Sequence, residues 1–291
     1  MEKPLGRDAT ENMANAHTSG RNDVDAAKDK KINIMSVGRV LLILLVVLLS
    51  LFLLSRSPLF CISEIEVTGI QYYNESQIID KSGLSIGQNG FEILGLGSIE
   101  GILTFRCLEV EKEISDACPY IKKVYAKFKM PDRIVIDVEE RSKLVVVPYQ
   151  DVGLLLDEDG YVIDAMKNYQ GTGLPVVKGM TFEGYNLGSK LATDSDLYID
   201  AVIAIISALR QSDRDTIEKL SYMVESIDVG DLKNIKLFIN NEFVVNIGDG
   251  SDIYYRISAL KEIYYNGLTN GERGLIDFSR GNKPFFEPEH A

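Results

Sequence analysis

Side chains that could carry catalysis are sparse in this sequence. Histidine, the usual proton-transfer residue near neutral pH, occurs in the 291 residues only at His17 and His290. A serine or cysteine nucleophile needs a base beside it, and the adjacent Ser189 and Lys190 do not supply the geometry of an S-x-x-K pair. Paired carboxylates for sugar hydrolysis could lie among the 43 acidic residues, but tryptophan, which commonly lines sugar clefts, is absent. We therefore expect a protein that is not an enzyme and that carries no cofactor.

Two other stretches match binding motifs only in part. Residues 157–160 (Asp-Glu-Asp-Gly) form an acidic tip, but the ligand spacing and closing glutamate of an EF-hand are missing. A solvated hairpin turn is the favoured interpretation of this tip. The run from Gly95 to Gly101 reads G-x-G-x-x-x-G. Its last spacing is wrong for a dinucleotide fingerprint, and no buried strand precedes it. We predict neither a metal site nor a nucleotide site.

The three cysteines do not form a disulfide framework. If residues 108–117 are helical, as their pattern indicates, the helix separates Cys107 from Cys118 by about 16 Å. A disulfide requires Cα atoms within about 7 Å of each other. We predict buried free thiols at these two positions and a structural role for Cys61.

The charge balance argues against a nucleic-acid partner. Acidic residues outnumber basic residues by 43 to 31, which gives a net charge of −12. Phosphate binding needs clustered lysine and arginine, which a chain this acidic does not offer.

One apolar segment, VLLILLVVLLSLFLL at residues 40–54, organises the chain. With upstream residues it provides roughly 20 positions, enough to cross a ~30 Å hydrocarbon core as a helix, so we predict a transmembrane signal anchor at 36–56. A cleaved signal peptide would be followed by a small-residue cleavage site, and a buried core helix would keep an amphipathic stripe; the segment has neither. Lysine and arginine gather before it, which predicts a cytoplasmic N-terminus and an extracytoplasmic C-terminal part.

The residues before the anchor differ in composition from the rest of the chain. Residues 1–35 are rich in Asn, Asp, Ala, Lys and Gly and hold almost no bulky apolar side chain. They cannot bury enough surface to offset the entropy of ordering. We predict a disordered cytoplasmic tail here and a single-pass, type II membrane protein.

Residues 58–141 have the pattern of a small α+β module. The expected elements are a strand at 60–67, a helix after Asn74, a helix at 108–117, and alternating strands at 120–130 and 133–140. Asn74 precedes Gln77 by three positions, which is a helix-start signature. The order predicts a β-α-α-β-β module whose two helices cover one face of a three-stranded sheet.

Residues 142–285 predict a second, mixed α/β module, followed by a tail at 286–291. The expected strands are 144–147, 154–156, 161–163, 222–229, 235–239, 243–247 and 274–279, with amphipathic helices at 196–210 and 252–265. The predicted fold class is therefore α+β, with a transmembrane helix followed by two modules.

The order of these features resembles the bacterial cell-division family FtsQ/DivIB. The motifs behind the resemblance are F-x-I-x-x-I-x-V-x-G starting at Phe60, Pro119 before an alternating strand, and P-x-R-I-x-I-x-V-x-E-R from Pro131 to Arg141. The resemblance covers about residues 35–285. It implies that 58–141 is a POTRA domain and that 142–285 is the family's β domain. The glycine-rich insertion around Gly95 is longer than the loop that the family usually has.

The resemblance implies a non-enzymatic, membrane-anchored scaffold of the divisome, located at the septum, which organises or regulates septal peptidoglycan synthesis. In the family, the last strands of the β domain receive a segment of DivIC (FtsB), which pairs with FtsL. Open sheet edges invite such strand addition. The receiving edge maps to Leu275, Ile276, Asp277, Phe278 and Ser279, with Tyr264, Tyr265, Phe285 and Phe286 as candidate anchors; for the two tyrosines, ordinary core packing is equally open. The alternatives are a POTRA-bearing outer-membrane assembly or secretion factor and a membrane-anchored cell-wall enzyme.

Overall fold

The computed structural model describes residues 34–94, 99–268, 273–281 and 283–289. Both histidines, the glycines at 95 and 97, and all but the last two residues of the predicted cytoplasmic tail lie outside these ranges. The chain divides into two units, Met1–Arg56 and Ser57–Ala291, and each is described by itself.

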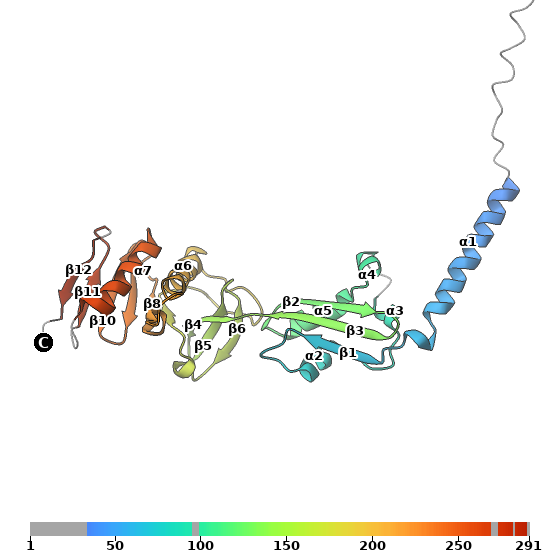
Figure 1. The fold of residues 1–291 in the computed structure, drawn as a ribbon, viewed down its shortest axis with the longest axis horizontal. Helices are drawn as coiled ribbons and strands as arrows, with labels where there is room; N and C mark the ends of the chain where they lie inside the picture. The colour runs from blue at the N-terminus through green and yellow to red at the C-terminus, as the bar shows by residue number, and fades with distance from the viewer. Residues whose placement is uncertain (1–33, 95–98, 269–272, 282, 290–291) are drawn as a thin grey trace, which may run out of the picture. The chain divides into compact units, whose positions relative to one another are not determined.

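The first unit contains helix α1, Ile34–Ser55 (Figure 1). Its 22 residues extend about 33 Å at 1.5 Å per residue, which matches a hydrocarbon core of about 30 Å. The segment Val37–Ser55 has a mean hydropathy of 2.9, and none of it is buried against the rest of the protein. By length and composition, this helix can cross a membrane, as predicted.

The second unit begins with a small α+β module in the predicted order β-α-α-β-β (Figure 1). Its elements are β1 (Glu64–Thr68), α2 (Glu75–Lys81), α5 (Leu108–Ala117), β2 (Ile121–Lys129) and β3 (Arg133–Glu140). The strand order is β1-β3-β2, with β3 parallel to β1 and antiparallel to β2. The sequence does not predict the short helices η1 (Pro58–Phe60), α3 (Gly90–Ile93) and α4 (Ile99–Thr104).

Both long helices of this module cover the same face of its sheet. β2 and β3 bury alternate residues, as side chains that alternate across a strand require. Ile78 of α2 and Ile114 of α5 belong to one hydrophobic cluster with Ala126, Ile134 and Ile136 of the sheet, and all five are fully buried. The alternation in the sequence therefore identifies the correct core face.

One local signal and one long-range contact explain where two helices of this module begin. The Asn74 side chain accepts a hydrogen bond from the Gln77 N–H at 2.9 Å, and the Gln77 side chain accepts one from the Asn74 N–H at 2.9 Å. This is the predicted capping box. At the start of α3, a Cβ on Gly90 would lie only 2.2 Å from the Phe128 ring. The close approach of α3 to β2 therefore requires glycine at this position.

The second module is built on a nine-stranded sheet with the order β12-β11-β10-β9-β8-β7-β4-β5-β6. The strands are β4 (Lys143–Tyr149), β5 (Val152–Asp157), β6 (Val162–Met166), β7 (Val176–Lys178), β8 (Val224–Asp228), β9 (Ile235–Ile239), β10 (Phe243–Gly248), β11 (Gly274–Asp277) and β12 (Phe285–Pro288). The helices are α6 (Leu197–Ser212) and α7 (Ile253–Glu262), with short turns η2 (Gln170–Thr172), η3 (Leu220–Tyr222) and η4 (Ile263–Gly267). The fold class is α+β, as predicted.

Helices α6 and α7 pack over one face of this sheet. Ile205 and Leu209 of α6 and Ile257 and Leu260 of α7 share a buried cluster with strand residues such as Val245. All five are at most 1% exposed. The buried apolar side chains follow the helical spacing that the sequence predicts, but Arg256 and Lys261 of α7 are also buried.

A buried ion pair joins the ends of the two helices. Lys261 Nζ lies 2.8 Å from Asp213 Oδ1, and Asp213 also accepts hydrogen bonds from the N–H groups of Leu220 and Ser221 at 3.0 and 2.8 Å. Burial acts to raise the pKa of Asp213, but the hydrogen bonds from Lys261, Ser221 and Leu220 outweigh it, so the pKa lies below its ordinary value. The carboxylate therefore holds its charge inside the protein.

The sheet extends further along the chain than the sequence predicts. Phe285–Pro288 pairs antiparallel with β11 as strand β12, although residues 286–291 are predicted as a tail. Phe286 is half-buried against the core, and its ring centroid lies 6.4 Å from that of Phe243. Its apolar side chain therefore stabilises a strand that the flanking prolines conceal in the sequence.

Candidate functional site

The residues predicted as the receiving edge lie inside the sheet. β11 pairs in parallel with β10 on one side and antiparallel with β12 on the other. Leu275, for example, lies between Val244 of β10 and Glu287 of β12. The prediction of a free edge at residues 275–279 is therefore wrong, because the chain continues beyond this strand and returns as β12.

Burial separates the predicted edge residues into two groups. Ile276 and Phe278 are fully buried core side chains, at 1% and 0% exposure. Leu275 and Asp277 are half-buried and Ser279 is exposed. The Ser279 N–H donates to Asp277 Oδ1 at 2.8 Å, which ends the strand in a tight turn. Only the second group can contact a partner without rearrangement of the core.

Tyr264 and Tyr265 lie in the turn η4 and pack on the hydrophobic core. The Tyr264 ring meets Phe243 edge-on at 5.9 Å, and its hydroxyl accepts a hydrogen bond from Asn240 Nδ2 at 2.7 Å. Burial raises the pKa of both tyrosines. Core packing, one of the two interpretations left open by the sequence, therefore accounts for the contacts that both rings make.

The outward edge of β12 offers few hydrogen-bond donors. The Glu289 N–H donates to the Arg273 carbonyl at 2.8 Å. Because hydrogen-bonded pairs alternate along an antiparallel ladder, the Glu287 N–H also faces β11, whereas Phe286 and Pro288 face away from the sheet. Proline has no N–H, so the outward edge presents the Phe286 N–H together with carbonyl groups. Prolines on edge strands limit indiscriminate pairing in this way.

The opposite edge of the sheet, β6, is partly covered by the protein itself. The Val162 N–H donates to the Ser189 carbonyl at 2.9 Å, and the Gly188 N–H donates to the Val162 carbonyl at 2.8 Å. The start of β6 therefore already has a neighbouring segment. β12 is the more accessible of the two edges.

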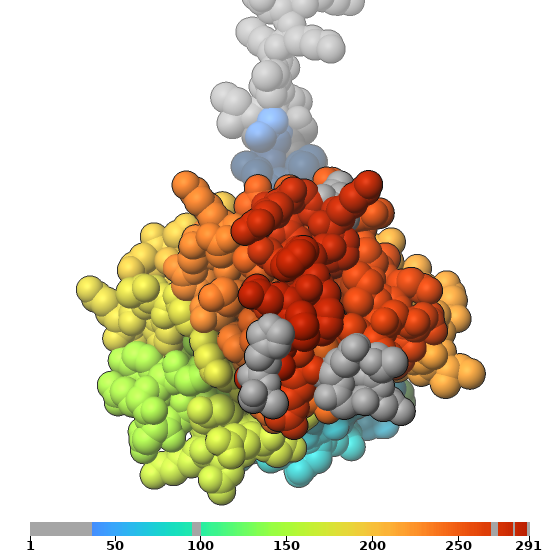
Figure 2. Space-filling view, turned by 90° about the vertical axis from the view of Figure 1, so that its left-hand side faces the viewer, coloured from blue at the N-terminus to red at the C-terminus, as the bar shows by residue number. Residues whose placement is uncertain are grey.

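The C-terminal end of the sheet, drawn in red, faces the viewer in Figure 2. A hollow of about 630 Å³ lies next to β12. Phe238, Val244 and Leu275 are cross-strand neighbours that line it. These side chains alternate with the residues that pack under α6 and α7, so the hollow lies on the other face of the sheet. Its rim carries the acidic residues Glu242, Glu287 and Glu289. This arrangement fits an apolar group flanked by positive charge.

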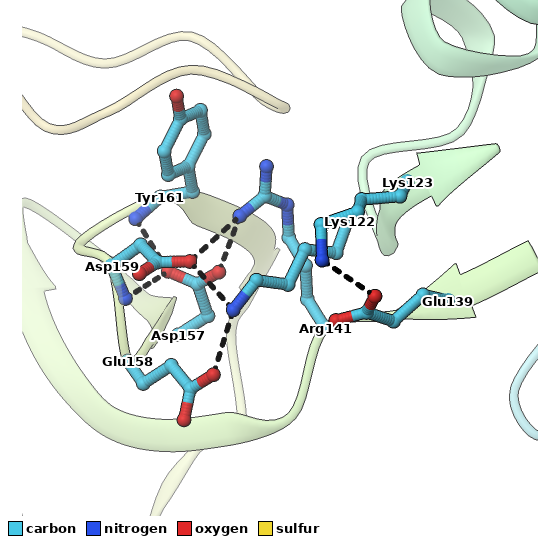
Figure 3. Close-up of polar contacts among 8 residues, drawn as sticks. All are labelled: Lys122, Lys123, Glu139, Arg141, Asp157, Glu158, Asp159 and Tyr161. Atoms are coloured by element: carbon cyan, nitrogen blue, oxygen red, sulfur yellow. Dashed lines mark hydrogen bonds and ion pairs between the residues drawn. The ribbon is translucent and has the colours of Figure 1, made fainter.

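The predicted solvated turn at residues 157–160 is instead part of a buried ion cluster (Figure 3). The Asp157 side chain is 0% exposed, and its Oδ2 lies 2.5 Å from Arg141 Nη1. Its Oδ1 accepts hydrogen bonds from the N–H groups of Asp159 and Tyr161 at 3.0 and 2.7 Å. The prediction of solvation is wrong for Asp157, because an arginine from the first module reaches this turn.

Neighbouring contacts extend the connection between the two modules. The Arg141 guanidinium lies 3.8 Å from the centroid of the Tyr161 ring, a cation–π geometry. Lys122 Nζ lies 2.7 Å from Glu158 and 2.9 Å from Asp159 (Figure 3). The acidic turn therefore faces basic residues at the end of the first module.

An apolar contact accompanies these charges. Tyr120, at the end of the first module, is 3% exposed and belongs to a cluster with Val146, Leu155 and Ile163 of the second sheet. Its hydroxyl donates to Asp164 Oδ2 at 3.0 Å. Burial, and then the carboxylate of Asp164, raise the pKa of this tyrosine. The two modules thus share a small hydrophobic core beside the ion cluster.

The cysteine side chains are not arranged for chemistry. Cys107 and Cys118 are buried free thiols, as predicted, and Cys61 is a half-buried free thiol. Burial raises the pKa of the Cys107 thiol to about 12 and also raises that of Cys118, which disfavours the reactive thiolate. Within the described ranges, no three His, Cys, Asp or Glu side chains gather as they would around a metal ion.

Comparison with known proteins finds similarity to cell division proteins. The family model for the FtsQ-type POTRA domain matches residues 60–141. The cell division protein DivIB of Clostridium acetobutylicum is 23% identical over 231 residues, which cover 79% of this chain and 84% of that protein. DivIB of Clostridium botulinum strain Hall is 24% identical over 260 residues, 89% of this chain and 93% of that protein. Over most of its length the chain is similar to cell division proteins of the FtsQ/DivIB family, and residues 60–141 match the FtsQ-type POTRA domain.

Other cell division proteins match over shorter stretches. The cell division protein FtsQ of Corynebacterium glutamicum is 23% identical over 198 residues, 68% of this chain and 72% of that protein. The major extracytoplasmic domain of DivIB from Geobacillus stearothermophilus aligns with 44% of this chain and 91% of that domain, at 14% identity and a TM-score of 0.26.

The end of the FtsQ-type POTRA match coincides with the junction between the modules. The match ends at Arg141, preceded by Glu140, which accepts hydrogen bonds from the N–H groups of Gln71, Tyr72 and Tyr73 at 3.0, 2.6 and 3.1 Å. Glu140 therefore holds the loop before α2, while its neighbour Arg141 binds the second module. The E-R motif marks both residues in the sequence, but nothing in it identifies Asp157 as the partner.

Proposed function

We propose that this FtsQ/DivIB chain is a non-enzymatic, single-pass scaffold of the divisome. Helix α1 anchors it with the N-terminus in the cytoplasm and the POTRA and β domains outside. At the septum, the β domain binds DivIC (FtsB) together with FtsL and thereby helps to organise septal peptidoglycan synthesis. The observation that carries the proposal is the outward edge of β12, next to a hollow lined by apolar side chains and glutamates, in a chain similar to cell division proteins.

Strand addition at β12 sets a specific register. A partner residue opposite Phe286 exchanges two hydrogen bonds with it, because this position faces away from β11. Pro288 accepts but cannot donate, so the pairing is weaker toward that end. Phe285, at 61% exposure, supplies a large apolar surface for a cross-strand side chain of the partner.

Charge favours a particular kind of partner segment. Glu242, Glu287 and Glu289 line the hollow beside β12, in a chain whose net charge is −12. A segment with lysine or arginine beside its apolar residues has complementary charge. We expect the contacting segment of DivIC to have this composition.

A matched pair of substitutions on opposite edges of the sheet tests the proposal. Phe285→Glu introduces a carboxylate on β12. Leu187→Glu introduces one beside β6, at a position where the leucine side chain is 50% exposed. Binding of the extracytoplasmic segments of DivIC and FtsL is measured by isothermal titration calorimetry. We expect Phe285→Glu to weaken binding by about tenfold or more, as for an apolar contact at the centre of an interface, and Leu187→Glu to leave it unchanged. Equal affinities of the two variants would contradict the assignment of β12.

A further inference from the structure

The chain enters the POTRA domain through a segment that two other parts of the domain hold in place. The Ile62 N–H donates to the Gln88 carbonyl at 2.8 Å, and the Ile62 carbonyl accepts from the Gly87 N–H at 2.8 Å. On the other side, the Ser63 N–H donates to the Asp132 carbonyl at 2.8 Å, and Ser63 Oγ lies 2.5 Å from Asp132 Oδ2. Residues 57–63, the loop 85–88 and the turn between β2 and β3 therefore lie side by side at one end of the domain.

Each of these three segments exposes a large aliphatic side chain. Leu59 is 63% exposed, Ile86 is 62% exposed and Met130 is 55% exposed. Their neighbours Phe60 and Phe91, in contrast, pack into the domain core. Exposed apolar side chains that gather at one place mark a surface that contacts a protein or a membrane.

Two exposed cations lie on β2, the strand that leads to Met130. Lys127 and Lys129 are exposed on β2, and neither makes an ion pair or side-chain hydrogen bond in the part of the chain that the structure describes. The nearby Arg133 is paired with Glu64 at 2.9 Å and with Glu66 at 3.7 Å. Asp132, in the neighbouring turn, accepts a hydrogen bond from Ser63, so the positive and negative charges at this end balance, and Lys127 and Lys129 are the cations available to an anionic ligand. We call Leu59, Ile86, Met130, Lys127 and Lys129 the tether patch.

The length of the chain between α1 and Leu59 limits how far this residue of the tether patch can lie from the apolar helix. Leu59 follows Ser55, the last residue of α1, by four positions, so a fully extended chain separates the two by at most about 14 Å. If α1 spans the bilayer, Leu59 lies at or near the lipid headgroups. Apolar side chains flanked by lysine are the composition that binds such an interface.

We propose that the tether patch rests on the lipid surface in which α1 is embedded. Leu59, Ile86 and Met130 enter the boundary between headgroups and acyl chains, and Lys127 and Lys129 contact anionic headgroups. The POTRA domain is then held against the bilayer by side chains from three adjacent segments as well as by its tether. This inference depends on the membrane anchoring that is part of the proposed function.

The absence of tryptophan from the sequence allows a direct test in the full-length protein. Single tryptophans are introduced by Ile86→Trp and Met130→Trp, and the variants are reconstituted in vesicles of phosphatidylglycerol and phosphatidylcholine. Fluorescence is compared with and without brominated lipid, which quenches tryptophan only at short range. Phe52→Trp, within α1, reports whether the anchor is inserted.

Leu187→Trp serves as the control for an exposed site away from the tether patch. Gly188 packs near Pro119, just before β2, whereas Met130 follows the other end of β2. The nine residues of that strand separate the two sites by about 30 Å. Leu187→Trp should therefore show no quenching.

The outcomes separate this inference from the proposed function. We expect quenching and blue-shifted emission for Ile86→Trp and Met130→Trp. When Lys127→Gln or Lys129→Gln is added to these variants, the ratio of lipid-bound to unbound domain should fall about fivefold for each lysine replaced. Quenching of Phe52→Trp alone would overturn the tether patch and leave the anchor in place. No quenching of Phe52→Trp would overturn both. Equal quenching of Leu187→Trp would show that the contact is not specific to the tether patch and would also overturn the inference.

Discussion

Replacing Arg141 by glutamine should destabilise the extracytoplasmic unit strongly. The Arg141 and Asp157 side chains are 9% and 0% exposed, and their closest atoms are 2.5 Å apart. Removing one partner of a buried pair costs about 3 to 5 kcal/mol, because the other charge remains buried. Asp157 keeps its hydrogen bonds from the N–H groups of Asp159 and Tyr161, so we expect a loss near the lower end, about 3 kcal/mol.

Urea unfolding of Ser57–Ala291, followed by circular dichroism at pH 7, measures this loss. With a slope of about 3 kcal/mol/M, the midpoint should fall by about 1 M. Lys123→Gln is the matched control, since the Lys123–Glu139 pair lies close by but both side chains are 52% exposed (Figure 3). Exposed pairs contribute little, so this variant should unfold with the wild type. If Arg141→Gln unfolds no earlier than Lys123→Gln, the buried pair does not stabilise the junction.

Two further predictions concern buried titratable groups. Cys107 and Cys118 should resist iodoacetamide at pH 8 in the folded protein, because burial raises both thiol pKa values, whereas the half-buried Cys61 should react. Mass spectrometry identifies the labelled cysteines. Labelling of Cys107 in the folded protein at the same rate as Cys61 would refute this prediction. The pKa of Asp213 is lower in the folded than in the unfolded protein, so its contribution to stability is present above the unfolded pKa of about 4 and is lost as the pH falls through the folded value. As the pH is lowered below about 4, the free energy of unfolding should therefore decrease less steeply in Asp213→Asn than in the wild type. Parallel pH profiles for the two proteins would show that the pairing of Asp213 with Lys261 does not make stability depend on pH.

The fold of the POTRA domain was predictable because its signals are local. The alternation in β2 and β3 and the Asn74 capping box each depend on residues close together in the sequence. The glycine-rich insertion was harder to predict, since glycine disfavours helices. Helix α3 forms there because Gly90 lets its backbone approach Phe128, a contact that no local pattern reveals.

The candidate site was predicted less well because its position depends on long-range pairing. The apolar run at 275–278 was correctly predicted as a strand, but whether it lies at an edge depends on where the chain goes next. Pro288 conceals β12, since proline is uncommon in strands. The buried state of Asp157 likewise depends on Arg141, which lies 16 positions earlier in another module.

Amide hydrogen exchange at β12 tests the central claim most directly. Two-dimensional NMR of labelled Ser57–Ala291 follows the N–H groups of Phe286 and Glu287 with and without the extracytoplasmic segments of DivIC and FtsL. The Glu287 N–H faces β11 and should be protected in both states, whereas the Phe286 N–H faces outward and should become protected only in the complex. Unchanged exchange of the Phe286 N–H in a saturated complex would contradict strand addition at β12.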